Sequence, residues 1–247
     1  MLISLITALL SGESNPALLL TEICMVLAIV LFSLSAHEAA HAYAAKRLGD
    51  YTAYYQGRIT LNPMKHLNPL GVLMMALVGI GWANPVPINP RNFREPRKGM
   101  MLSSLAGPLS NLILAVIATF FSCLMDYLIY RDHVNGRMTD NSFYVCLSLF
   151  FFLTAYLNYS LAVFNLIPCP PFDGSRIFFY FLPKSWYFRV MRYERYLGIG
   201  ILLLVLGLSY VAINPVSYIV GELYTLISGP FNKFFSLIFD LPIYGLV

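Results

Sequence analysis

Three ionisable side chains stand close together in an apolar part of the sequence. His37, Glu38 and His41 form the pattern His-Glu-x-x-His within the stretch FSLSAHEAAHAYAAKRLGD. On a helix the two histidines lie about 40° apart and one turn apart, so both imidazoles can bind one Zn²⁺. Glu38 lies about 60° around from His41, where it can reach a metal-bound water without being a ligand. The pattern predicts a hydrolytic zinc site.

The surroundings of this pattern matter more than its spacing. On a soluble helix, two histidines four residues apart are often ordinary surface residues. Inside a membrane an ionisable side chain costs on the order of 2.5 to 3.5 kcal/mol, and a bound metal compensates that cost. Lys46 and Arg47 mark the end of the helix, which puts Glu38 roughly 12 to 14 Å below the membrane surface. Water must therefore reach the site through a cavity from the cytoplasm.

A catalytic zinc needs a third protein ligand and an open position for water. The other two histidines, His66 and His133, fall in a boundary linker and on the opposite side of the membrane. Asp173 is the better candidate, because the prolines before it and the glycine after it in NLIPCPPFDGSR end one helix and can bend the carboxylate back into the bundle. By itself, Asp173 is also consistent with a helix N-cap.

The elements that must position these residues are membrane helices. The chain has 247 residues, 58% of them hydrophobic, only 16 Lys and Arg and 12 Asp and Glu, and a mean hydropathy of +0.68. This composition excludes disorder, secreted disulfide scaffolds and nucleic-acid binding. Four stretches are long and apolar enough to span, at about 16–45, 99–130, 143–167 and 196–213, and a fifth at 216–239 is left open.

We therefore expect an all-α polytopic membrane protein, a bundle of about four to six transmembrane helices. The whole chain, 1–247, is predicted to be one domain, with a catalytic core at about 16–182 and C-terminal helices at about 196–240. Residues 50–62 and 83–93 are rich in β-branched, aromatic or proline residues and predict a small hairpin or sheet at the membrane boundary. Residues 68–82 are too short to span and predict a re-entrant segment.

The distribution of positive charge predicts the orientation of the chain. Thirteen of the sixteen Lys and Arg residues fall within 46–98 and 174–195. Positively charged loops face the cytoplasm. The sequence thus predicts a multi-pass protein of a bacterial cytoplasmic (inner) membrane, with its active site opening to the cytoplasm.

Two separated motifs resemble the site-2 protease family of intramembrane zinc metalloproteases. The first is the His-Glu-x-x-His pattern, and the second is an Asn-x-x-Pro-x-Pro-x-x-Asp-Gly pattern running from Asn165 to Gly174. Four further segments are similar to the minimal bacterial members: RLGD at 47–50, GRITLNPMKHLNPLG at 57–71, WANPVPINPRNF at 82–93 and AGPLSNL at 106–112. Together with the two motifs, the similarity covers roughly residues 30–180. Phe172 stands where a Leu is usual, and the PDZ and CBS domains of larger members are missing.

This resemblance implies roles for individual residues. Zn²⁺ is held by His37, His41 and Asp173, and Glu38 activates the water that attacks a peptide bond. Asn165 stabilises the oxyanion or holds unwound substrate, or else it only links helices through a hydrogen bond. Asn111 favours helix packing.

The expected substrate is a membrane protein with a single spanning helix that unwinds locally within the lipid bilayer. A homo-oligomer is left open, and no nucleic-acid partner is expected. The main alternative is a membrane metal-ion transporter or sensor that uses the same His, Glu and Asp cluster, although transporters place polar residues through the full membrane thickness. Two weaker alternatives are an inactive relative that only binds helices and a zinc protease of another kind, completed by a later glutamate: Glu95, Glu194 or Glu222.

Overall fold

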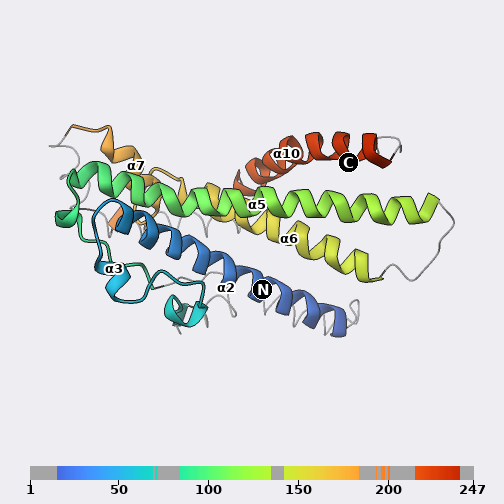
Figure 1. Ribbon diagram of the computed structural model, residues 1–247, viewed down its shortest axis with the longest axis horizontal. Coiled ribbons are helices and arrows are strands. Elements are labelled where there is room, and N and C mark those ends of the chain that lie inside the picture. Colours follow the sequence, from blue (N-terminus) through green and yellow to red (C-terminus); the bar gives the residue numbers. More distant parts are fainter. Residues whose placement is uncertain are drawn as a thin grey trace. The chain divides into compact units, whose positions relative to one another are not determined.

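The computed structural model describes residues 16–68, 70–71, 84–134, 142–183, 193, 196–197, 200 and 215–239. These residues are mostly helical and contain no strand. The α-helices are α2 (Pro16–Arg47), α3 (Thr52–Tyr55), α5 (Pro96–Val134), α6 (Ser142–Asn165), α7 (Asp173–Tyr180) and α10 (Pro215–Phe239), and the short 3₁₀ helices are η1 (Pro63–Lys65) and η2 (Pro90–Asn92) (Figure 1).

Three of the described helices are long and apolar enough to cross a membrane. They are Leu20–Arg47 in α2, Pro96–Val134 and Phe143–Asn165. The prediction of an integral membrane protein built from helices is therefore confirmed. The predicted span at 196–213 lies almost entirely outside the described residues. Residues 216–239 do form a helix, α10, but it is not one of the three candidates.

The predicted hairpin is not confirmed, because residues 50–62 contain a helical turn. The carboxylate of Asp50 accepts a hydrogen bond from the Thr52 backbone N–H at 3.0 Å, which favours the start of α3. Gly57 follows with a left-handed φ of 65°, a conformation that ends the turn and that glycine adopts at little cost. Local capping has outweighed the β propensity of the tyrosines and threonines. The predicted re-entrant segment at 68–82 lies mostly outside the described residues.

The chain divides into two compact units, Met1–Ser110 with Leu166–Ile199, and Asn111–Asn165 with Gly200–Val247. In the second unit, α10 packs on α6 around an apolar core. The core consists of small residues on facing helices and one large ring: Ala115, Ala118, Ala155, Val220 and Tyr159. Small side chains let helix backbones approach closely, which is typical of packing in membranes. That the chain forms one domain stays a prediction.

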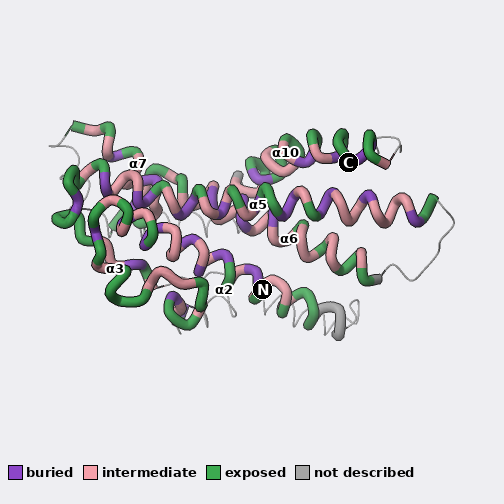
Figure 2. The backbone as a smooth tube through the Cα atoms, viewed as in Figure 1, coloured by how far each residue is buried: buried purple, intermediate pink, exposed green. Residues whose placement is uncertain are grey.

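In the first unit, a buried stripe runs along α2, and Ser35 and Ala42 are buried beside it. The stripe repeats every fourth residue, and each of its members is at most 6% exposed: Ile29, Ser33, His37, His41 and Ala45. In Figure 2 the buried parts of α2 lie in its middle and its C-terminal part, and a more exposed part precedes them. Because a spacing of four residues keeps side chains on one helix face, both histidines point into protein rather than into lipid.

Candidate metal centre

Three ligand atoms from two helices converge in the first unit. The Nε2 atoms of His37 and His41 are 3.0 Å apart. The Oδ2 atom of Asp173 lies 3.2 Å from each of them. The two imidazole planes are nearly perpendicular, at 89°, so the nitrogens point at a common position instead of stacking. The structure thus brings together the three side chains predicted as ligands, as a group that could hold a metal ion; that they bind zinc stays a prediction.

The triangle of ligand atoms fits a zinc ion. Ligands at about 2.0 to 2.1 Å around a tetrahedral Zn²⁺ are about 3.3 Å from one another, close to the 3.0 and 3.2 Å observed between these atoms. Two imidazoles and a carboxylate are also a donor set that zinc accepts in catalytic sites. Among the described residues this is the group of histidine and carboxylate side chains that could hold a metal.

Hydrogen bonding orients the His41 ring. Its Nδ1 lies 2.7 Å from the carbonyl oxygen of Ser103 on α5. A carbonyl only accepts, so Nδ1 carries the proton and donates it, and Nε2 keeps its lone pair for a metal. Partners of this kind fix the tautomer and orientation of metal-binding histidines. Nδ1 of His37 is buried and has no hydrogen-bond partner among the described residues.

Gly107 on α5 makes room for both rings. A Cβ atom added to Gly107 would overlap Nε2 and Cε1 of His41 and Cε1 of His37. The backbone of α5 therefore lies directly against the edges of both imidazoles that could bind a metal. Only glycine allows a helix to approach this closely.

Asp173 is positioned by the start of α7. Phe172 is the N-cap residue and Asp173 is the first residue of the helix, so the alternative reading of Asp173 as an N-cap is wrong. A Cβ on Gly174 would overlap the backbone of Leu166 and Ile167, which brings the start of α7 close to the chain that leaves α6. The start of α7 thereby places the Oδ2 atom of Asp173 3.2 Å from the Nε2 atoms of both imidazoles.

The other end of α7 is fixed by an arginine on α5. Nη2 of Arg97 donates to the carbonyl oxygens of Phe179, Tyr180 and Leu182 at 3.1, 2.7 and 2.6 Å. The last carbonyls of a helix lack partners within it, and a cationic side chain there satisfies them and favours the helix dipole. Arg97 therefore holds the helix whose first residue is Asp173.

Glu38 lies on the same helix as the histidines but outside the ligand triangle. Its Oε2 atom accepts a hydrogen bond of 2.9 Å from the backbone N–H of Val86. The carboxylate is half-buried, and its charge acts on His41. Glu38 is not part of the group of side chains that could hold a metal, and its role as the base stays a prediction.

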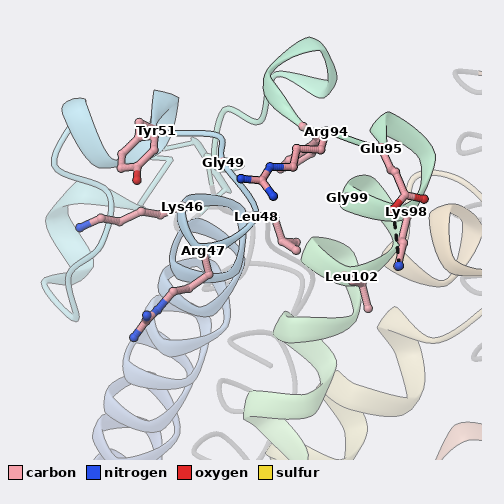
Figure 3. A pocket seen from close by; sticks show the side chains of 11 residues that line it. Lys46, Arg47, Leu48, Gly49, Tyr51, Arg94, Glu95, Lys98, Gly99 and Leu102 are labelled. Atoms are coloured by element: carbon pink, nitrogen blue, oxygen red, sulfur yellow. Dashed lines mark ion pairs between the residues drawn. The ribbon is translucent and has the colours of Figure 1, made fainter.

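A cavity of about 420 Å³ lies at the end of α2, apart from the metal-binding atoms. Four of its eleven lining residues are basic, and Figure 3 shows Lys46 and Arg47 pointing away from the other lining residues. Lys46 lies 3.5 Å above the ring of Tyr54, and Arg47 donates to the hydroxyl of Tyr43. Lys98 pairs with Glu95 at 3.6 Å (Figure 3). None of His37, His41 and Asp173 lines this cavity.

Comparison with known proteins identifies the family. A sequence model described as "Peptidase family M50" matches residues 87–206. "Putative zinc metalloprotease YwhC" of Bacillus subtilis (strain 168) is 43% identical over 167 residues, which cover 68% of this chain and 73% of that protein. The chain belongs to peptidase family M50. Membership of this family, the site-2 proteases, confirms the resemblance predicted from the two motifs, and it makes the chain a membrane zinc metalloprotease.

More distant M50 relatives are longer than the part that matches. "Putative zinc metalloprotease Rip2" of Mycolicibacterium smegmatis is 34% identical over 155 residues, 61% of this chain and 54% of that protein. "Zinc metalloprotease MJ0392" of Methanocaldococcus jannaschii is 27% identical over 198 residues, 79% of this chain and 46% of that protein. The chain thus spans about half the length of these two proteins. No solved structure matches it at a significant level.

The predicted role of Asn165 in this M50 protein stays a prediction. Asn165 ends α6 in the second unit, and its amide donates to the carbonyl of Leu161 within the same helix at 2.9 Å. Asn111, predicted to pack, is fully buried, and neither its amide nitrogen nor its amide oxygen has a hydrogen-bond partner among the described residues.

Sequence reasoning missed several groups of the M50 site. The Ser103 carbonyl and the Val86 N–H are backbone atoms, which leave no trace in residue type. Arg97 was counted only as one of many boundary charges. Gly107 lies within the AGPLSNL segment, and its closeness to the histidines becomes visible only in the folded structure.

Proposed function

We propose that this chain is an intramembrane zinc metalloprotease whose zinc is held by His37, His41 and Asp173. It hydrolyses a peptide bond in or near a transmembrane segment of a membrane protein. The observation that carries the proposal is the convergence of three ligand atoms within 3.2 Å of one another, two of them on a helix long enough to span the bilayer.

The proposed chemistry divides between the metal and the carboxylate of Glu38. A bound zinc ion supplies an electrophile for the substrate carbonyl and lowers the pKa of water at the site. Glu38 takes the proton of the attacking water and passes it to the leaving amine nitrogen, as a general base and then a general acid. The protein's own contribution is orientation, through the Ser103 carbonyl on His41 and the N–H of Val86 on Glu38.

The proposed substrate is a single membrane-spanning helix that unwinds locally. A helix uses its carbonyls in its own hydrogen bonds, so a peptide bond is open to attack only where the helix is broken. The location in a bacterial inner membrane, with the site open to the cytoplasm, rests on the positive charges at the end of α2 and at the start of α5.

Substitution of Glu38 and Asp173 tests both halves of the proposal. The test uses the full chain in lipid nanodiscs and a reporter with one membrane-spanning helix interrupted by Asn-Pro. We expect Glu38→Gln to keep one zinc per chain by elemental analysis and to abolish cleavage of the reporter. Asp173→Ala should lose both the bound zinc and the cleavage of the reporter. Cleavage by Glu38→Gln at the wild-type rate would refute the role of Glu38, and wild-type zinc content in Asp173→Ala would refute the ligand set.

The transporter alternative is not favoured. The relatives compared with this chain are named zinc metalloproteases. A transport path needs polar sites through the membrane thickness, whereas the described residues gather their metal-binding side chains in one place. Zinc flux into vesicles containing Glu38→Gln, without proteolysis, would reverse this preference.

A further inference from the structure

The extended segment beside α2 touches the catalytic carboxylate through one backbone atom. Residues 84–89 read NPVPIN, and they form neither helix nor strand. Prolines at positions 85 and 87 have no N–H, so Val86 carries the one amide proton in the stretch 85–87. That proton is the one donated to Oε2 of Glu38, at 2.9 Å. The sequence thus leaves a single donor at the position that faces the base.

The placement of this donor does not depend on Glu38. The side chain of Val86 is 8% exposed and packs in a small apolar cluster with Ala42 and Ala53. Ala42 follows the metal ligand His41 directly in α2. A residue before proline is also restricted to extended conformations, which fixes the direction of the N–H. Packing and backbone stiffness together hold the donor against α2.

Both ends of the segment are held by further hydrogen bonds. At one end the Asn84 backbone N–H donates to the His66 carbonyl at 2.7 Å, and its side-chain amide donates to the Leu67 carbonyl at 2.8 Å. At the other end the Asn89 N–H donates to the buried carboxylate of Asp50 at 2.7 Å. The donor to Glu38 is therefore fixed before any substrate arrives.

We propose that the Val86 N–H is a positioning group for the reaction: it holds Oε2 of Glu38 so that Oε1 faces the attacking water. This inference rests on the proposed function. A base must lie within about 2.6 to 3.2 Å of the proton that it accepts, and a carboxylate free to rotate spends part of its time outside that range. One fixed oxygen removes this freedom and leaves the other oxygen for the proton.

The sharpest test replaces the Val86 amide by an ester. Incorporating α-hydroxyvaline at position 86 exchanges the N–H for an oxygen and keeps the side chain. We expect kcat for the Asn-Pro reporter to fall about 10- to 100-fold, as for other outer groups that orient a metal site, with KM and zinc content unchanged. Val86→Pro, which also lacks the N–H, should show the same loss of kcat.

Ile88→Ala is the matched control, because it leaves the Val86 N–H and side chain in place and shortens a neighbouring side chain packed on the same apolar cluster. It should melt at a lower temperature with kcat within about twofold of wild type. An ester variant with wild-type kcat, or one that changes only KM, overturns the inference. Failure of the proposed function looks different, because then the zinc-loaded wild type itself cleaves nothing.

A double-mutant cycle checks the contact without using activity. The melting temperatures of Glu38→Ala, the ester variant and their combination are compared with wild type. A contact that couples the two groups makes their effects non-additive. Strictly additive shifts would show that the N–H does not act on Glu38, and they would also overturn the inference.

Discussion

Replacing Gly107 by alanine tests how tightly the metal centre is built. The added Cβ overlaps atoms of both imidazoles, so either the rings or the helix must move. Forcing an extra carbon into a packed site costs about 1 to 3 kcal/mol, and each 1.4 kcal/mol corresponds to a factor of ten in affinity. If the rings move, the affinity of the site for zinc should fall about 5- to 150-fold.

Zinc affinity is measured by competition with a chelator on the full chain in detergent, beside the melting temperature and cleavage of the reporter. Gly99→Ala is a matched control, because it lies on the same helix and its Cβ would overlap the ring of Phe93 instead of a ligand. It should melt lower and keep its zinc affinity. Gly221→Ala, with open space around it, should be neutral or slightly stabilising. Wild-type zinc affinity in Gly107→Ala would show that α5 moves to make room for the added Cβ, and that the close contact between α5 and the imidazoles does not determine zinc binding.

Two further substitutions probe the supports of the site. Arg97→Ala removes three hydrogen bonds to the end of α7 and should lower zinc affinity several-fold, because Asp173 is then held less firmly. Arg94→Ala, at an exposed arginine nearby, should leave zinc affinity unchanged. Equal zinc affinity in the two variants would contradict the role of Arg97. Hydrogen bonds from Thr52, Asn92 and Asn89 outweigh the effect of burial and hold the pKa of Asp50 below its usual range. The charged carboxylate therefore stabilises the fold above about pH 3.9. This stabilisation is lost as the pH falls through the lowered pKa. Asp50→Asn should therefore lower the free energy of unfolding by about 1 to 3 kcal/mol at pH 7, measured by thermal unfolding. The difference in this free energy between the variant and wild type should shrink below about pH 3.9. A difference that stays constant with pH would contradict the reasoning.

The parts of the site that sequence could predict are those carried by local spacing. His37, Glu38 and His41 lie within one and a half turns of a helix, so helix geometry alone relates them. Asp173 comes from a segment far along the chain, and it was found because proline and glycine around it limit what the backbone can do. The predicted hairpin was not confirmed, because β propensity averages over environments. At this place the carboxylate of Asp50 accepts a hydrogen bond from the Thr52 N–H and favours a helical turn.

The support for the three predicted ligands is uneven, and this follows from where each lies. His41 sits where α2 meets the backbone of α5, so a carbonyl is at hand for its Nδ1. Asp173 is held through both ends of a short helix. His37 lies one turn earlier, and its buried Nδ1 has no partner among the described residues. A buried polar atom without a partner costs about 1 to 3 kcal/mol. Coordination of a metal through Nε2 would not supply a partner for Nδ1, so the binding energy of the metal would have to outweigh this cost. Within the described chain, the polar contacts of the His37 ring are those of Nε2 with His41 and Asp173, and the backbone of α5 at Gly107 packs against its edge.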